Sequence, residues 1–191
     1  MSDPASNDPA SNDQTSSDQA SNDAASSETP PRDLPPLGFA RLLATGLGSG
    51  LSPVAPGTTG SIAAVLMVLI LDRTTPFPWW GPLALALGGA VVQIALGKWI
   101  ARAYPGGDPG EVVLDEWVGQ WIALGGVWRL ELGWVGIVAA FALFRLFDIT
   151  KGPGVRQAER LPGAWGILMD DVVAGLYAGA LLWAGAALLA G

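Results

Sequence analysis

Apolar residues gather in five segments along the chain, and Gly, Pro and charged residues separate them. The second segment, residues 79–100, and the fifth, residues 172–190, are long enough to cross a bilayer, because a helix rises 1.5 Å per residue and about 20 apolar residues span the hydrocarbon. The other three segments, residues 58–71, 117–128 and 132–147, are short. Each short segment is predicted to be a marginal span, a helix packed inside the bundle or a re-entrant piece.

None of the five segments alternates apolar and polar residues as a strand would. Gly and Ala are abundant, as they are where membrane helices pack closely, and most Trp residues lie near segment ends, as in an interfacial belt. The pattern predicts an all-α, polytopic helical membrane protein with about five apolar helices. Thr58 or Thr59 is the expected N-cap of the first helix.

Composition divides the chain into a tail, residues 1–36, and a domain, residues 37–191. The tail is a near-repeat of five residues with Asp at each period and a net charge of −6, whereas the domain has a net charge of −1. With almost no large apolar residue, the tail is predicted to be disordered. The domain lacks the basic surface that binding to nucleic acid requires, so no nucleic-acid partner is expected.

Charged residues predict how the helices are oriented in the membrane. If the five segments run up and down in order, seven basic residues lie on one side and two, Arg73 and Arg129, on the other. The positive-inside rule then makes the first side cytoplasmic. The seven are Arg41, Lys98, Arg102, Arg145, Lys151, Arg156 and Arg160.

Carboxylates collect on the same side as two doublets and a single residue. Acids at helix starts interact well with the helix dipole, but this accounts for one acid per helix and not for an acid at a helix end. Carboxylates brought together repel, and a divalent cation is the usual remedy. Oxygen ligands in a chain without His or Cys favour Mg²⁺ or Mn²⁺. The predicted ligands are Asp115, Glu116, Asp148, Asp170 and Asp171.

The same side also carries candidate groups for binding an anion. The stretch GLGSGLSPVAPGTTGS, residues 46–61, is rich in Gly and hydroxyl residues and leads into a helix N-terminus, where phosphate binds well. A Gly/Pro-rich turn is the structural alternative for this loop, and a local ion pair is the alternative for Lys151. The predicted phosphate-binding residues are Gly48, Ser49, Gly50, Ser52, Thr58, Lys151 and Arg156.

Metal, cations and an anion-receptive loop at a membrane face indicate phosphoryl chemistry on a lipid head group. Without Cys or His, neither a thiol nor an imidazole is available as nucleophile or base. Metal-activated water remains, with a carboxylate as general base and Lys or Arg stabilising the developing charge. Which carboxylate is the base stays open. The candidate catalytic residues are Asp115, Glu116, Asp148, Lys151, Asp170 and Asp171.

Four stretches resemble, in order and spacing, the motifs of the phosphatidylglycerophosphatase A family. They are ATGLGSGLSPVAPGTTGS, DPGEVVLDEWVG, FRLFDITKGPGVR and GILMDDVVAGLYAG, within residues 38–190. The resemblance implies a helical enzyme of the bacterial inner membrane that hydrolyses phosphatidylglycerophosphate to phosphatidylglycerol with Mg²⁺. By motif match, Asp115 and Glu116 take the DE positions, Asp148 and Lys151 the D…K positions, and Asp170 and Asp171 the DD positions.

One stretch departs from the family pattern. Members commonly continue the D…K motif as KPWPIR, whereas residues 151–156 read KGPGVR. Lys151 and Arg156 are retained, so anion binding is still expected. Because Gly152 and Gly154 stand where the family has prolines, the loop is expected to be more flexible, with a possible change in efficiency or head-group preference.

Two other functions compete with this interpretation. One is a phosphatase for another lipid or a soluble phosphate monoester. The other is a non-catalytic, cation-binding component of membrane transport, which fits the acidic residues but not the phosphate-receptive loop. The oligomeric state cannot be predicted from this sequence.

Overall fold

A computed structural model of the protein describes residues 38–105 and 109–190. The predicted acidic tail, residues 1–36, lies outside these ranges. The described residues form seven α-helices and one short 3-10 turn, with no strand among them, which confirms the all-helical prediction. The elements are α2 (Phe39–Ala44), η2 (Ser49–Leu51), α3 (Pro56–Thr74), α4 (Gly81–Ala103), α5 (Leu114–Leu130), α6 (Gly133–Thr150), α7 (Val155–Glu159) and α8 (Ala164–Ala190).

Four helices are long and apolar enough to cross a membrane, namely α3, α4, α6 and α8. The second and fifth apolar segments were expected to span, and they do meet this criterion as α4 and α8. The first and fourth segments become longer helices than their apolar runs indicated, because α3 continues through Asp72 and Arg73 and α6 continues through Asp148 to Thr150. Polar residues at a helix end can reach the interface, so they extend a span without entering the hydrocarbon.

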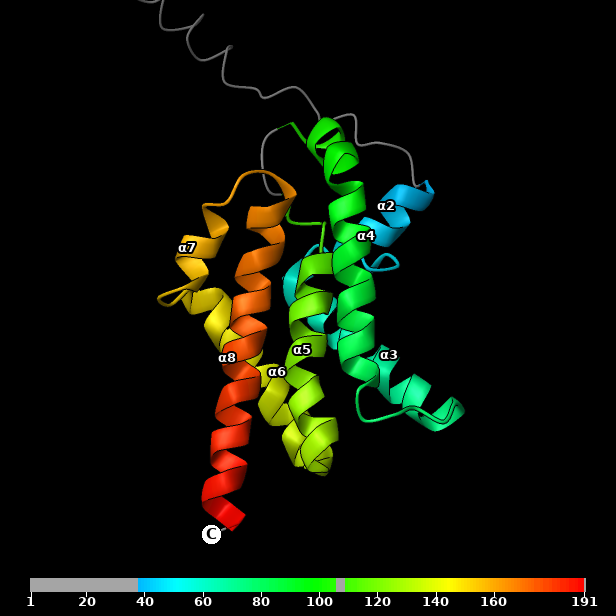
Figure 1. The fold of residues 1–191 in the computed structure, drawn as a ribbon. Coiled ribbons are helices and arrows are strands. Elements are labelled where there is room, and N and C mark those ends of the chain that lie inside the picture. The colour runs from blue at the N-terminus through cyan, green and yellow to red at the C-terminus, as the bar shows by residue number, and fades with distance from the viewer. Residues whose placement is uncertain (1–37, 106–108, 191) are drawn as a thin grey trace, which may run out of the picture. The chain divides into compact units, whose positions relative to one another are not determined.

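The third apolar segment forms α5, which packs inside the bundle. Figure 1 shows α5 with α8 on one side and α4 on the other, and α5 contacts α3, α4, α6 and α8. Its large side chains, including Trp117, Trp121 and Leu124, are buried. A helix that is apolar on all sides is expected at the centre of a bundle, so the structure selects this alternative over a marginal span.

Small residues let α5 and α8 approach within backbone contact. A Cβ atom on Gly119 would lie 2.6 Å from the carbonyl oxygen of Asp171, and one on Gly175 would lie 2.4 Å from the carbonyl oxygen of Gly119. Glycine at such positions is how membrane helices pack tightly. The contact fixes where Asp171 lies along the axis of α8 relative to the first turns of α5.

Two predictions about helix starts are wrong. Helix α3 begins at Pro56 with Ala55 as a left-handed N-cap, so Thr58 and Thr59 lie inside its first turn. Proline at the first position suits a helix start because its missing N–H would have no partner there. Helix α8 begins at Ala164, so Asp170 and Asp171 lie well inside the helix rather than at its first turn. Asp115 and Glu116 do lie in the first turn of α5, as expected.

Gly119→Ala is expected to destabilise the protein, because the added methyl group would press on Asp171 and on Phe144, 2.4 Å from its Cε2 atom. Overpacking costs about 1–3 kcal/mol, so the melting temperature in detergent should fall. The matched control is Gly185→Ala on the same bundle, where an added Cβ meets nothing within 4 Å. Equal melting temperatures for the two variants would contradict the close α5–α8 contact.

Candidate metal centre

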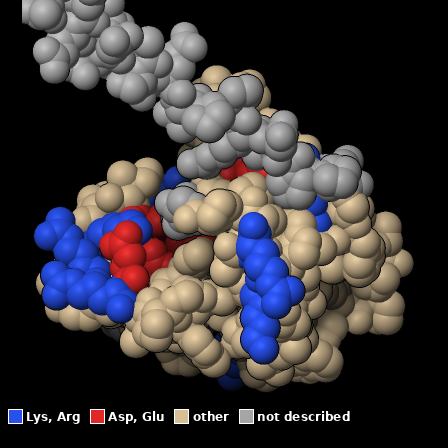
Figure 2. Space-filling view, turned by 90° about the horizontal axis from the view of Figure 1, so that it is seen from above, with Lys and Arg blue, Asp and Glu red and all other residues tan. Residues whose placement is uncertain are grey.

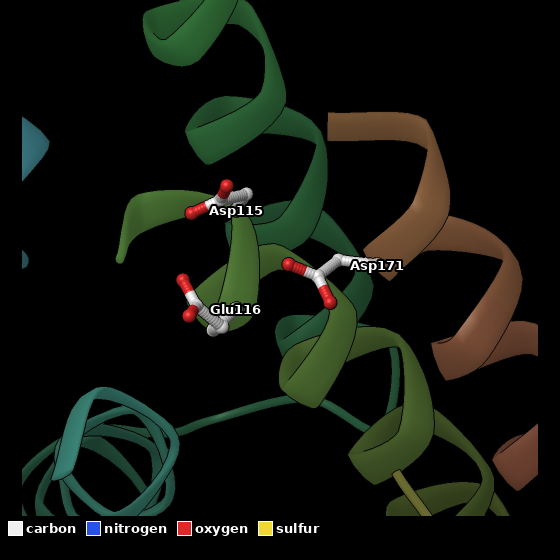
Figure 3. A group of neighbouring side chains, drawn as sticks. All are labelled: Asp115, Glu116 and Asp171. Carbon is white, nitrogen blue, oxygen red and sulfur yellow. The ribbon is translucent and has the colours of Figure 1, made fainter. Parts of the chain in front are cut away.

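Three carboxylates from two helices meet near one end of the bundle. Asp115 and Glu116 come from the first turn of α5 and Asp171 comes from α8. One oxygen from each lies within 4.8 Å of the others, and Figure 3 shows the three groups facing a common space. Asp115 and Asp171 are buried, and Glu116 is partly buried. The grouping brings together three of the five predicted ligands.

The electrostatics of this group are suited to binding a cation. Glu116 Oε2 and Asp171 Oδ1 are buried and have no hydrogen-bond partner among the described residues. Burial raises the pKa of Glu116 above its usual value, and the nearby charge of Asp148 acts in the same direction. Carboxylates in a low-dielectric site repel strongly unless a positive charge lies between them. A set of oxygen ligands this close together fits a hard divalent cation such as Mg²⁺, Mn²⁺ or Ca²⁺.

Asp148 lies beside the group but has its own partner. Arg145, one turn earlier on α6, donates from Nη1 to Asp148 Oδ2 at 2.5 Å. The charges of both residues act on Glu116. Asp148 is therefore near the three carboxylates without being one of the mutually close set, and whether it binds the cation stays a prediction.

Arg145 and Gly57 contribute to the site and were not among the predicted residues. A Cβ on Gly57 would lie 2.5 Å from Glu116 Oε1 and 3.2 Å from Arg145 Nη1. The start of α3 is thus in contact with the carboxylate group. The spacing of Arg145 and Asp148 is a helical i, i+3 pair, which could have indicated Arg145. Gly57 belongs to the glycine-rich stretch 46–61, but nothing in the sequence indicates its contact with Glu116.

Asp170 and Asp171 are adjacent in sequence but lie in different surroundings. Adjacent residues on a helix point about 100° apart, so only Asp171 faces α5. Asp170 Oδ2 accepts a hydrogen bond from Lys151 Nζ at 3.1 Å, and the same Nζ donates to Glu159 Oε1 at 2.8 Å. Partial burial lowers the pKa of Lys151, but the hydrogen bonds to Glu159 and Asp170 outweigh it and the pKa is raised.

A pocket of about 420 Å³ lies on the Asp170 side, between the end of α4 and the start of α8. Its lining includes Asp170, Glu159 and Ile100. Lys151 instead lines a smaller depression with Arg156 and Pro153, in the stretch that departs from the family pattern. The two predicted anion-binding cations of this stretch are therefore neighbours, and Arg156 is exposed.

The glycine-rich loop contacts the site through its end rather than its middle. Ser49 Oγ donates to the Gly46 carbonyl at 2.8 Å, and Ser52 Oγ donates to the Val54 carbonyl at 2.9 Å, so both hydroxyls stabilise local turns. Gly48 has a left-handed φ of 92°. Thr58 is half-buried in the first turn of α3.

Gly50 is buried, and a Cβ there would lie 2.1 Å from the carbonyl oxygen of Glu111. This glycine is therefore required for packing against the segment that precedes α5. The prediction that Gly48, Gly50 and the loop hydroxyls bind phosphate stays untested.

A partly buried ion pair fixes the segment that leads into α5. Arg41 on α2 donates from Nε to Glu111 Oε1 at 3.2 Å and from Nη2 to Glu111 Oε2 at 3.0 Å. The Tyr104 hydroxyl at the end of α4 donates to the same carboxylate. Burial, followed by the hydrogen bond to Glu111, raises the pKa of Tyr104 to about 12. Bidentate Arg–carboxylate geometry is specific, so it determines where α5, with Asp115 and Glu116, begins.

Comparison with known proteins matches the chain to one family. The model of the family described as phosphatidylglycerophosphatase A matches residues 42–186, a range that contains every carboxylate of the site. Two named members of similar sequence are the phosphatidylglycerophosphatase A of Escherichia coli K12, 36% identical over 74% of this chain and 80% of that protein, and that of Haemophilus influenzae, 40% identical over 72% and 82%.

A Bacteroides thetaiotaomicron protein with the provisional name phosphatidylinositol-3-phosphatase is 43% identical over 71% of this chain and 86% of its own length. No solved structure matches the chain.

Asp171→Asn is expected to weaken divalent-cation binding at least about tenfold, since even partners of metal ligands contribute about 10–100-fold to affinity. Binding of Mn²⁺ to the purified protein, followed by electron paramagnetic resonance, measures this without any turnover. The control is Asp72→Asn at the far end of α3, where the new amide oxygen can still accept from Trp128 Nε1, now 3.1 Å from Asp72 Oδ1. Unchanged Mn²⁺ affinity in Asp171→Asn would exclude this metal centre.

Proposed function

We propose that this chain, which belongs to the phosphatidylglycerophosphatase A family and is a membrane phosphatase, hydrolyses the phosphate monoester of phosphatidylglycerophosphate to give phosphatidylglycerol. The observation that carries the proposal is the buried group of Asp115, Glu116 and Asp171 inside the matched range. A noncatalytic transport role is set aside, because the chain is a member of a family of phosphatases.

The proposed cofactor is Mg²⁺, held by Asp115, Glu116 and Asp171, with Asp148 and Asp170 as the flanking carboxylates of the predicted set. When bound, a divalent cation supplies Lewis-acid chemistry: it makes water easier to deprotonate and stabilises negative charge on the phosphoryl group. Glu116 Oε2 and Asp171 Oδ1 are available for it, since neither has a partner among the described residues.

The protein's own residues then orient the reactants and move the proton. A carboxylate of the site takes a proton from the attacking water as general base. The water oxygen forms a bond to phosphorus and the bond from phosphorus to the glycerol oxygen breaks. The carboxylate then returns its proton to that glycerol oxygen, so that inorganic phosphate and phosphatidylglycerol result. Lys151 and Arg156, which share one depression beside Asp170, are proposed to attract the anionic head group.

The proposed location is the bacterial inner membrane, with the site facing the cytoplasm. The starts of α3, α5 and α8 and the ends of α4 and α6 lie toward one end of the bundle (Figure 1). The seven basic residues of the predicted cytoplasmic side belong to these elements or their connections. Figure 2 looks onto this end and shows basic side chains in separate groups, with acidic side chains exposed beside one of them. Both the charge bias and the bacterial relatives support the proposal.

A second substrate is favoured by one observation. The relative from Bacteroides thetaiotaomicron is named for phosphatidylinositol 3-phosphate, and its identity of 43% exceeds that of the two relatives named for phosphatidylglycerophosphate. Both substrates are lipids that carry a phosphate monoester on a polyol head group. The same carboxylates could serve either one, so head-group preference requires a direct comparison.

Purified protein in detergent is expected to release phosphate from phosphatidylglycerophosphate with Mg²⁺ and to stop when a chelator is added. Asp171→Asn should abolish release, while Asp72→Asn should leave it unchanged. Phosphatidylinositol 3-phosphate and glycerol 3-phosphate, assayed at equal concentration, test the other lipid and a soluble monoester. Faster release from either of these two would replace the proposed substrate, and release that persists with chelator would overturn the metal mechanism.

Arg156→Gln is expected to raise the KM for the anionic lipid by about two- to fivefold with little change in kcat, because an exposed charge contributes weakly to binding. The difference from wild type should shrink at high salt, where charges are screened. The matched control is Arg160→Gln, an exposed arginine that does not line the depression. If Arg160→Gln raises KM equally, the effect belongs to general surface charge and not to Arg156.

A further inference from the structure

An apolar groove of about 270 Å³ lies between α3 and α4, with α5 at its floor. Met67 lines it from α3, and Leu85 and Val92 line it from α4. Trp117 and Trp121 of α5 form the floor, with their rings packed edge to face at 5.3 Å. The lining is almost wholly apolar, and no residue placed in the catalytic mechanism belongs to it.

The groove exists because α3 and α4 barely touch each other. Each of them packs on α5 instead, and Trp121 Nε1 donates to the Ala64 carbonyl at 3.1 Å, which holds α3 against α5. Both α3 and α4 are candidate membrane spans, so a gap between them is open to lipid rather than to water. Gly88 and Gly89 line the groove from α4 and have no side chain that would fill it.

The groove is lined in part by Leu114 and Trp117 from the first turn of α5, the turn that also carries Asp115 and Glu116. Trp117 is 4% exposed, and its Nε1 has no hydrogen-bond acceptor among the described residues. Its indole lies against Gly46, where an added Cβ would be 2.6 Å from Nε1. Trp117 directly follows Glu116 on α5. A buried N–H without a partner is costly in a native structure, and a ligand that brings an acceptor to it would remove that cost.

We propose that this groove binds one acyl chain of the lipid substrate, with the Trp117 N–H donating to an ester oxygen at the head of that chain. A lipid matches the groove in both respects. Its acyl chain is apolar, as the groove lining is, and its ester oxygen can accept the hydrogen bond that the Trp117 N–H lacks. The phosphate monoester of the same molecule then lies toward Glu116 and its neighbours. This inference rests on the proposed function, since it assigns a binding site for the apolar part of that substrate.

Gly88→Leu tests the groove without disturbing the packed helices. An added Cβ on Gly88 meets nothing within 4 Å, although the residue lines the groove. The matched control is Gly185→Leu on α8, which is equally open and lies outside the groove. Gly88→Leu should raise the KM for long-chain phosphatidylglycerophosphate about tenfold, as expected for displacing roughly two methylene groups from apolar contact. Hydrolysis of the deacylated head group should be unchanged.

Trp117→Phe tests the polar end, because an aromatic ring is kept beside Trp121 while the N–H is removed together with the five-membered part of the indole. Its KM for the long-chain lipid should rise about three- to tenfold, the loss of one hydrogen bond, again with no effect on the deacylated head group. Equal effects of either variant on both substrates, or an equal effect of Gly185→Leu, would overturn the acyl-chain assignment.

Native mass spectrometry in detergent measures lipid binding in the groove independently of lipid hydrolysis. Wild-type protein and Gly185→Leu should retain added phosphatidylglycerol as a bound lipid, and Gly88→Leu should lose it. If lipid is retained in this pattern while no lipid phosphate is hydrolysed, the groove stands and the proposed function fails. If Gly88→Leu retains lipid as well as wild type, or instead changes the oligomeric mass, the groove does not hold an acyl chain and the inference fails.

Discussion

The backbone contact between α5 and α8 is the constraint on which the site depends. Gly119 and Gly175 allow each helix to touch the other's main chain, and the Asp171 carbonyl lies against Gly119. Because the helices cannot slide past such a contact, the Asp171 side chain is held next to the first turn of α5. The three mutually close carboxylates are a direct consequence of this packing, since two of them are adjacent in sequence and only the third must be brought in.

The surrounding charges sort the carboxylates into two kinds. Asp148 and Asp170 each accept a hydrogen bond from a cation of the protein, Arg145 and Lys151 respectively. Glu116 and Asp171 instead have oxygens without a partner among the described residues. Leaving a buried charge unpaired is far more costly than pairing it. The arrangement therefore places the need for an external cation at one point, between α5 and α8, and not along the whole acidic face.

Relatives of this chain are named for lipids with different head groups, a glycerophosphate and an inositol phosphate. These lipids have their acyl chains and a phosphate monoester in common. A groove for the chain and a metal centre for the phosphate would serve both, and the head group would be distinguished elsewhere. If Lys151 and Arg156 bind the head group as proposed, the depression that they line with Pro153 is the natural place for such a difference.

Local patterns in the sequence were sufficient to predict the five long helices and to point out the carboxylates that form the buried group. Hydrophobic runs indicated five helices because a membrane helix must be apolar over most of its length, and the acidic doublets in a chain without His or Cys indicated an oxygen-ligand cation site. The i, i+3 spacing of Arg145 and Asp148 was visible as well. These features depend on residues that are close together in the chain.

Tertiary packing decided which segments and side chains lie next to one another, which local sequence patterns do not contain. The short third segment became the central helix because its neighbours surround it, and the Asp170–Asp171 doublet was divided because adjacent helical residues point in different directions. Gly57 came to lie against Glu116, and Trp117 against Gly46, across long stretches of sequence. The sequence by itself determined which residues are candidates to bind a cation and a phosphate. Only the packing of α3, α4 and α8 on α5 decided which of them meet, because that depends on distances between helices far apart in the chain.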